Sequence, residues 1–277
     1  MWCLCAALPL RSLSSPLRPL VIIPTAGGGP LHATLAACAG WPMLVVDDSA
    51  DGLIHQQHPE LRWLRTPGRQ GFARACNEGL AWAESNGHPL ALLLNDDAAP
   101  APGCIAALSS AWTDADGALG PVLIDPKGQV EGAGMTVAWW GRVRAVRRAP
   151  PGPAHVDALS GACMLVASRC RLDPAYAHGF EDVALCLQLR RAGRAVRIIP
   201  DARCHHAGGA TVHRRSADAQ RHAVSGHLRL VGGGWRSVPV LGLAAAQVVR
   251  EGGSTLRFHA IADGWRDWRQ AALKPDR

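Results

Sequence analysis

The chain has 277 residues, 48% of them hydrophobic and 18% charged, which supplies enough apolar material for one large core or two modest cores and excludes a disordered chain. Its nine cysteines include no CxxC pair, which excludes zinc-ribbon and thioredoxin-like sites and favours a reducing, cytoplasmic compartment. The formal net charge of +7 arises after Ala202, where 12 Arg and Lys residues outnumber 5 Asp and Glu residues.

The first half of the chain alternates apolar runs with amphipathic stretches. Buried strands are predicted at four short apolar runs: Leu20–Thr25, Met43–Ser49, Leu61–Leu64 and Leu90–Asp97. One helix is predicted near Leu31–Cys38, and another between Gly71 and Gly87, where apolar residues recur at helical spacing. Strands that alternate with helices indicate an α/β fold, with a mostly parallel sheet and helices on both of its faces.

Two of these strands end in carboxylate pairs, Asp47-Asp48 and Asp96-Asp97. Because the carboxyl ends of parallel strands meet at one edge of a sheet, we expect the four carboxylates to converge there. A core cannot hold unpaired carboxylates, so a cation or a hydrogen-bonding ligand is indicated. The alternative is that these residues only cap the helices that follow them.

Polar residues also interrupt the predicted elements of the second half. Ala158–Val166 is a predicted strand in which Ser160 and Gly161 indicate either a bulge or the close approach of a ligand. Glu181 and Asp182 open a predicted helix that ends before Gly193, and this acidic start is either functional or a favourable cap.

A histidine pair, His205-His206, follows the predicted strand Ala195–Pro200. Two adjacent histidines are either surface residues or candidate ligands, and the pattern by itself leaves both interpretations open.

Seven blocks in this order resemble a known family: VIIPT, VVDDSADG, GFARACNEGLAWA, LLLNDD, LSGACMLV, GFEDVALCLQLRRAG and PDARCHHAGGAT. The family is that of the inverting GT-A glycosyltransferases of family 2, particularly the bacterial rhamnosyltransferase-like branch. The resemblance implies a GT-A domain at residues 20–211, after an unmatched segment at 1–19 and before a basic, Trp- and Arg-rich helical appendage at 212–277.

The resemblance also implies roles for individual residues. Residues that match the nucleotide-sugar site are Thr25, Asp47, Gly71, Arg74, Asn77, Asn95 and Asp96. Asp97 and His206 match the ligands of a Mg²⁺ or Mn²⁺ ion, and Asp182 matches the catalytic base, with Glu181 beside it. Gly161 and Ala162 match the acceptor site.

These roles predict metal-dependent, inverting transfer of a sugar from a nucleotide-diphosphate donor to a saccharide or lipid-linked acceptor in cell-surface polysaccharide or glycolipid assembly. Two departures from the family pattern stand out: Asp96 replaces a spacer residue in the metal motif, and Ala184 replaces an acidic residue.

Two other classes of protein remain open. A nucleotidyltransferase would carry Lys or Arg soon after TAGGGP, and none follows closely. A non-catalytic nucleotide-sugar-binding protein would lack the Glu-Asp pair, which is present.

The basic C-terminal part interleaves arginine with aromatic residues. These are Arg214, Arg215, Arg221, Arg229, Arg236, Arg250, Arg257, Arg266 and Arg269, with Trp235, Phe258, Trp265 and Trp268. Such a composition suits peripheral contact with the inner face of the cytoplasmic membrane, and no nucleic acid is expected as a partner. The alternative is a set of helices packed on the main domain, with tryptophans inward and arginines solvated. The apolar run Ser237–Val249 is shorter than the about 20 residues that span a bilayer.

Overall fold

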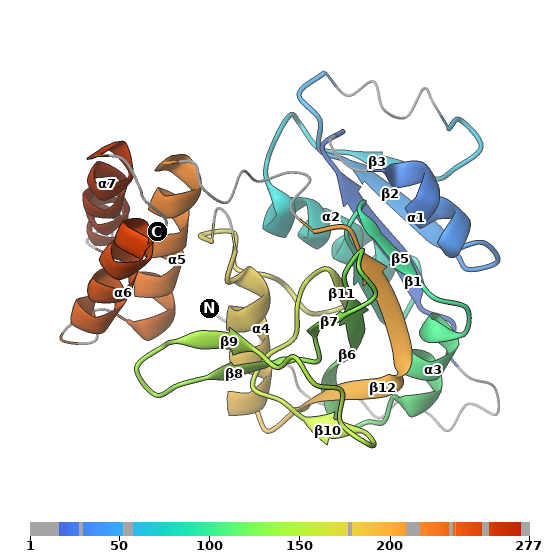
Figure 1. Cartoon of the computed structure of the whole chain (residues 1–277). Coiled ribbons are helices and arrows are strands. Elements are labelled where there is room, and N and C mark those ends of the chain that lie inside the picture. Colours follow the sequence, from blue (N-terminus) through green and yellow to red (C-terminus); the bar gives the residue numbers. More distant parts are fainter. Residues whose placement is uncertain are drawn as a thin grey trace.

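The computed structural model describes residues 17–27, 30–51, 58–176, 179–208, 217–232, 235, 237–250 and 255–272. Figure 1 shows an α/β body followed by three C-terminal helices that pack beside it. The strands are β1 Leu20–Thr25, β2 Met43–Asp47, β3 Trp63–Arg65, β4 Leu90–Leu94, β5 Ala98–Pro100, β6 Asp116–Ile124, β7 Val130–Gly132, β8 Met135–Val137, β9 Val143–Ala145, β10 Ala154–His155, β11 Cys163–Ala167 and β12 Ala195–His206. The helices are α1 Leu31–Ala37, α2 Phe72–Ser85, α3 Cys104–Ala111, α4 Glu181–Arg191, α5 Ala217–Val231, α6 Ser237–Arg250 and α7 Thr255–Ala272.

The main sheet has the strand order β10-β12-β6-β11-β4-β1-β2-β3, with β5 paired to β12 and β7 to β6. Strands β3, β2, β1 and β4 run parallel to one another, and β12 runs parallel to β6. Strand β11 lies antiparallel between β4 and β6. The predicted α/β class, with its helix-covered sheet, is confirmed.

Helices cover both faces of the sheet because every strand in its centre is apolar on both sides. On one face, α1 and α3 pack on Val21 and Ile23 of β1. On the other face, α2 and α4 belong to the core that includes Ile22. Gly79 brings α2 close to β1, since an added Cβ there would lie 2.4 Å from a side-chain atom of Ile22.

The cysteines of the described part are free thiols that act as small core residues, as the sequence predicts for Cys38, Cys76, Cys163 and Cys186. Burial raises the pKa of Cys38 and of Cys186 to about 12, so these thiols stay protonated.

Two predicted boundaries in the second half are wrong. The strand predicted at Ala158–Val166 begins only at Cys163, because the residues before it form a turn beside α4. The strand predicted to end at Pro200 continues to His206, with a register shift between Ile199 and Arg203. Proline lacks the N–H that a ladder needs, so the strand bulges there and then resumes its pairing with β6.

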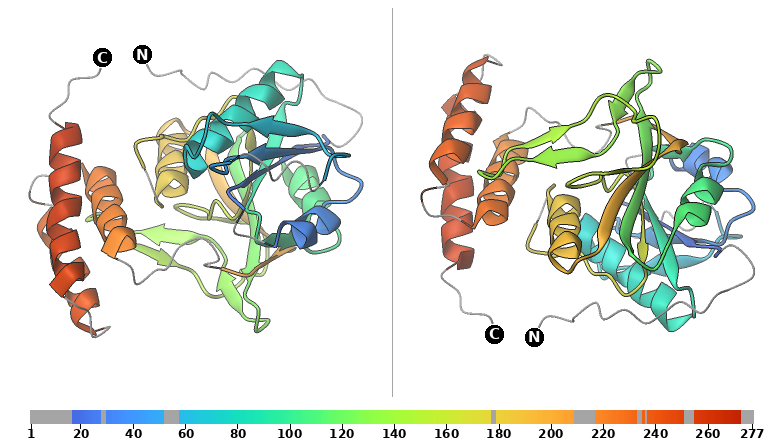
Figure 2. Two further views of the ribbon diagram at one scale, coloured as in Figure 1. Left: turned by 90° about the horizontal axis from the view of Figure 1, so that it is seen from above. Right: turned by 90° about the horizontal axis from the view of Figure 1, so that it is seen from below.

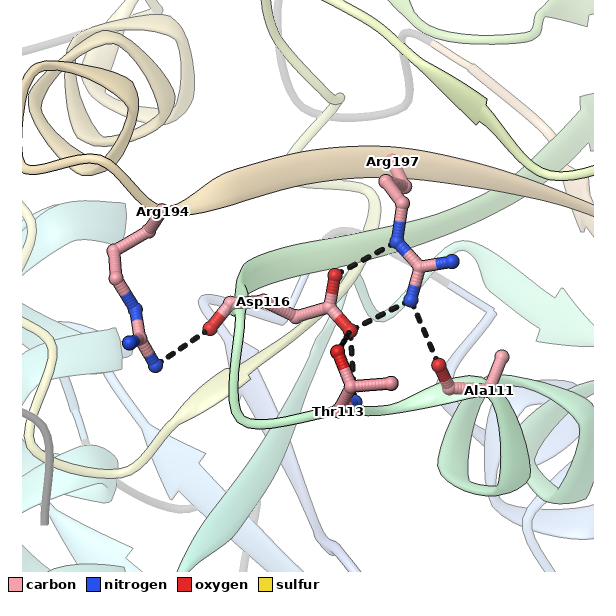
Figure 3. A network of polar contacts seen from close by, with 5 residues as sticks. All are labelled: Ala111, Thr113, Asp116, Arg194 and Arg197. Atoms are coloured by element: carbon pink, nitrogen blue, oxygen red, sulfur yellow. Dashed lines mark hydrogen bonds and ion pairs between the residues drawn. The ribbon is translucent and has the colours of Figure 1, made fainter. Parts of the chain in front are cut away.

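A buried ion pair holds β12 to β6 at the end of these strands opposite His206. Figure 3 shows the Arg197 guanidinium donating to both carboxylate oxygens of Asp116, over 2.7 and 2.6 Å, and to the carbonyl of Ala111. The backbone N–H and hydroxyl of Thr113 donate to the same carboxylate, and Arg194 donates to the Asp116 carbonyl. This network fixes the register of β12, which carries a histidine of the candidate site at its far end.

The C-terminal helices have a core of their own, built from Val224, Leu228, Val240, Val248 and Ile261. Figure 2 shows α5 facing the hairpin of β8 and β9. His227 of α5 stacks on Phe180 with ring centroids 5.1 Å apart, and its Nε2 contacts the carbonyl of Gly141 in the hairpin.

Many of the arginines and tryptophans in these helices make internal contacts. Arg221 pairs with Asp267, Arg257 is buried against Gln220, and Trp265 and Trp268 pack on the helical core. These contacts agree with the packed-helix alternative, whereas Arg214, Arg215 and Arg236 lie outside the described residues. Among the helices that the structure describes, none is both long and apolar enough to cross a membrane.

Candidate active site

The carboxyl ends of β1, β2 and β4 meet at one edge of the sheet, as the sequence predicts. The Thr25 hydroxyl at the end of β1 donates to Asp96 Oδ2 over 2.6 Å, and Thr25 pairs with Asp47 of β2 in the strand register. Thr34 of α1 donates to the Asp96 carbonyl over 3.0 Å. The carboxylate of Asp96 therefore ties the end of β4 to β1, and its backbone carbonyl ties it to α1.

The two carboxylates after β2 differ in what they bind. Asp48 accepts bonds from the backbone N–H groups of Gln70 and Gly71, both over 2.8 Å, and from the Thr66 hydroxyl. It therefore fixes the loop before α2, although within the described residues it binds no N–H group of the helix itself and is not a helix cap. Asp47 is 1% exposed, and its Oδ1 accepts bonds from the backbone and hydroxyl of Ser49.

The three residues at the start of α2 and within it that are assigned to the nucleotide site have distinct surroundings. Gly71 precedes the helix with a φ of 89°, a conformation that favours glycine. Arg74 is exposed. Asn77 donates to the carbonyl of Leu172 and accepts from its N–H, each over 2.8 Å, so its amide holds the segment before α4 against α2. A contact of Asn77 with a nucleotide stays a prediction.

Asp97 and His206, far apart in the sequence, lie together because β5 pairs with β12. In that pairing His206 is opposite Ala98, and the N–H of Ala207 donates to the Asp97 carbonyl. His206 Nε2 lies 3.4 Å from Asp97 Oδ1, and His206 Nδ1 lies 2.8 Å from Glu131 Oε2. His205 points elsewhere on the same strand and is exposed. The sequence did not reveal Glu131, because it belongs to a three-residue strand with no recognisable motif.

The charges in this group act on one another. The neighbouring His206 lowers the pKa of Asp97, against the opposite effect of burial. Burial lowers the pKa of His206, but the carboxylates of Asp97 and Glu131 outweigh burial and raise it.

Asp97 and His206 fit a divalent cation that keeps open positions for a ligand. Asp97 Oδ1 is buried and accepts no hydrogen bond from the described residues, so it faces His206 Nε2 without being satisfied by it. Within the described ranges, no group of three or more His, Cys, Asp or Glu residues is arranged to hold a metal ion. With two protein ligands, a divalent ion would keep coordination positions for the phosphate oxygens of a bound nucleotide.

The Glu181-Asp182 pair opens α4 as predicted. Phe180, which precedes the helix, is the one non-glycine residue of the described chain with a positive φ, 72°. Asp182 accepts bonds from the N–H groups of Gly161, over 2.8 Å, and Val183, over 2.7 Å. Glu181 is 8% exposed, and its Oε2 has no hydrogen-bond partner among the described residues.

The two carboxyl groups are electrostatically unlike an ordinary acidic cap. Burial, followed by the charge of Asp182, raises the pKa of Glu181 to about 8, so this carboxyl is largely neutral at pH 7. Burial also raises the pKa of Asp182, against its two backbone hydrogen bonds. Burial therefore opposes the stabilisation that the start of a helix gives to the ionised form of Asp182.

The turn of Gly161 and Ala162 connects the two acidic groups. Gly161 N–H binds Asp182, and the Ala162 carbonyl accepts the N–H of Asn95, over 3.0 Å, next to Asp96 and Asp97. An added Cβ at Gly161 would lie 3.4 Å from Asp182 Cβ. One short turn thus contacts both the Asp182 carboxylate and Asn95, the residue that precedes Asp96 and Asp97.

A cavity of about 110 Å³ lies next to this turn. Its lining includes Glu131, Ser160, Met135, Leu159 and Cys163. The cavity therefore borders Glu131, which contacts His206, and Ser160, which precedes Gly161.

Comparisons with known proteins bear on the family and the fold of the chain. Residues 31–168 match the family described as glycosyl transferase family 2. The N-acetylglucosaminyl-diphospho-decaprenol L-rhamnosyltransferase of Mycobacterium tuberculosis, in strains CDC 1551 and H37Rv, is 29% identical over 236 residues, which cover 70% of this chain and 76% of that protein. The crystal structure of GalNAc-T7 with UDP, GalNAc and Mn²⁺ has a TM-score of 0.63 and 15% identity over 79% of this chain. This match spans 48% of that protein, and it shows a shared fold.

Proposed function

Since the chain belongs to glycosyltransferase family 2, we propose that it transfers a sugar, with inversion, from a nucleotide-diphosphate donor to a hydroxyl acceptor in cell-surface polysaccharide or glycolipid assembly. The observation that carries the proposal is the placement of two acidic groups on one turn. Gly161 N–H binds Asp182, and the Ala162 carbonyl binds the N–H of Asn95, which begins the motif that ends in Asp97.

The donor would bind along the edge formed by β1, β2 and β4. Its nucleotide and sugar would contact the residues already assigned to it: Thr25, Asp47, Gly71, Arg74, Asn77, Asn95 and Asp96. Asp97 and His206 would hold Mg²⁺ or Mn²⁺, and such an ion stabilises the negative charge that develops on a diphosphate leaving group.

Asp182 would act as the general base. The acceptor oxygen attacks the anomeric carbon, the bond from that carbon to the diphosphate oxygen breaks, and the hydroxyl proton moves to the Asp182 carboxylate. A single displacement from the face opposite the leaving group inverts the anomeric centre. The N–H groups of Gly161 and Val183 hold the carboxylate in one orientation throughout.

We assign the acceptor to the Gly161-Ala162 turn and the adjoining cavity. The related Mycobacterium tuberculosis protein is named for a diphospho-decaprenol substrate, so a lipid-linked saccharide is the acceptor class that we favour.

A thermal-shift screen tests the donor assignment. A ligand that binds only the native state at 100 times its Kd stabilises a protein by about 2.7 kcal/mol. We expect Tm to rise with a uridine or thymidine diphosphate sugar plus Mn²⁺, and the rise to disappear in chelator. Binding without any transfer would favour the binding-only alternative, and turnover of a nucleoside triphosphate with a sugar phosphate would favour a nucleotidyltransferase.

We also propose weak peripheral attachment to anionic membrane through the C-terminal helices, which would bring the site to a lipid-linked acceptor. Large apolar side chains remain exposed there, including Trp235 and Leu256 at 65% and 69%, and Arg250 at the end of α6 is exposed as well. Each basic residue contributes about 1 kcal/mol near an anionic surface. Liposome sedimentation should show binding to anionic vesicles that weakens with salt, because screening shortens the reach of surface charge. Equal recovery with neutral vesicles, or indifference to salt, would contradict electrostatic attachment.

A further inference from the structure

We propose that Glu131 is a positioning residue for His206: it holds the imidazole in the tautomer, and in the orientation, that present the Nε2 lone pair to a divalent ion bound at Asp97. This role rests on the proposed function, in which Asp97 and His206 are the ligands of the metal ion. Glu131 Oε2 lies 2.8 Å from His206 Nδ1, across 75 positions of sequence. The side chains of Glu131 and His206 are 29% and 11% exposed, so the contact is largely shielded from water.

The strand that carries Glu131 is bulged at this residue. Leu123 of β6 pairs with Gly132, and the next residue, Ile124, pairs with Val130, so Glu131 has no partner in the ladder. A bulge adds one residue to a strand and redirects its side chain, and bulges are frequent beside active sites. Ile124 also pairs with His205 of β12, which places the bulge next to His206.

The turn before the bulge fixes its register. Asp125 Oδ1 accepts the N–H groups of Lys127 and Gln129, over 2.9 and 2.8 Å, and Gly128 adopts a φ of 77°. The Asp125 side chain and the left-handed Gly128 close this turn, which fixes the position at which β7 begins to pair with β6. Glu131 is therefore aimed at His206 by local structure that does not depend on a ligand.

The chemistry of the contact dictates the tautomer. A neutral imidazole carries one N–H, and ionised carboxylates only accept, so the shorter contact, 2.8 Å from Nδ1 to Glu131 against 3.4 Å from Nε2 to Asp97, places the proton on Nδ1 when His206 is neutral. Nε2 then carries a lone pair, and it faces Asp97 Oδ1 at 3.4 Å. Histidines that bind metals through one nitrogen commonly donate the other N–H to a carboxylate, which fixes the ring and raises its basicity.

Metal affinity of the full chain tests the proposal without any turnover. By calorimetric titration with Mn²⁺ alone, Glu131→Ala should raise the Kd by about 10- to 100-fold, the usual effect of removing such a partner. Glu131→Gln should recover much of the affinity, because its amide oxygen still accepts the Nδ1 proton. Glu84→Ala is the matched control, since it removes an exposed ion pair with Arg171 away from the site and should leave the Kd unchanged.

Nitrogen NMR of His206 in metal-free protein provides the second measurement, at alkaline pH where the imidazole is neutral. The parent should carry its proton on Nδ1, and Glu131→Ala should shift the population toward the Nε2-protonated form. A parent that binds Mn²⁺ with the same Kd as Glu131→Ala, or a tautomer unchanged by the substitution, would overturn the role of Glu131. If instead the tautomer shifts as expected but the parent binds no Mn²⁺, the role of Glu131 stands and the metal-dependent function is wrong.

Discussion

Replacing Asp182 with asparagine is expected to lower kcat by about 10²- to 10⁴-fold, the usual contribution of a general base, while donor binding persists. Asparagine has nearly the same size but cannot accept the acceptor's proton. The structure adds a cost in stability: both oxygens of Asp182 accept backbone N–H bonds, and an amide can satisfy only one of them. We therefore expect a loss of about 1 to 3 kcal/mol in unfolding free energy, and turnover should be measured well below the lowered Tm.

Glu181→Gln is the matched control for this experiment. Because burial raises the pKa of Glu181 to about 8, its carboxyl is already largely neutral at pH 7, and glutamine is a neutral side chain of similar shape. Turnover of this variant should stay close to that of the parent. A severe loss in Glu181→Gln combined with near-parental turnover in Asp182→Asn would transfer the base role to Glu181.

Replacing Asp97 with alanine is expected to abolish metal-dependent donor binding and to lower kcat/KM by at least about 10²-fold, since a bound cation contributes several kcal/mol to the stabilisation of a leaving group. The core should remain intact, because Asp97 lies at the edge of the sheet and its side chain contacts His206 rather than the apolar layers. Calorimetric titration of nucleotide diphosphate with and without Mn²⁺ provides the measurement, with circular dichroism as the check on folding.

The two adjacent histidines offer a matched pair for the same assay. His206→Ala should resemble Asp97→Ala, whereas His205→Ala, on the exposed side of the same strand, should bind donor and metal like the parent. Parental metal dependence in both Asp97→Ala and His206→Ala would show that the ion, if any, binds elsewhere.

The edge of the sheet was predictable from sequence because it follows from strand direction. The apolar runs that end at Thr25, Asp47 and Leu94 are parallel strands, so the polar residues at and after their carboxyl ends meet at one edge of the sheet. The start of α4 was equally predictable, since Glu181 and Asp182 begin a helical pattern that ends before Gly193.

What the sequence could not reveal depends on pairing across long separations. The antiparallel direction of β11 depends on its pairing with β4 and β6, which are both distant from it in the sequence. The role of Glu131 depends on a bulge that only the register of β6 and β7 defines. The Asn77 amide resembles a ligand-binding residue in sequence, yet in the structure it pairs with the backbone of Leu172.

The central claim is that the sugar is transferred in a single displacement, with Asp182 as the base and the nucleotide diphosphate as the leaving group. The most direct test is proton NMR of the transfer product, with the nucleotide sugar selected by the thermal-shift screen as donor and a short-chain polyprenyl-diphosphate saccharide as acceptor. The proposed roles, Asp182 as the base and Asp97 with His206 as the metal ligands, predict a product whose first-formed anomeric configuration is the reverse of the donor's. A product that retains the donor's configuration would contradict this arrangement.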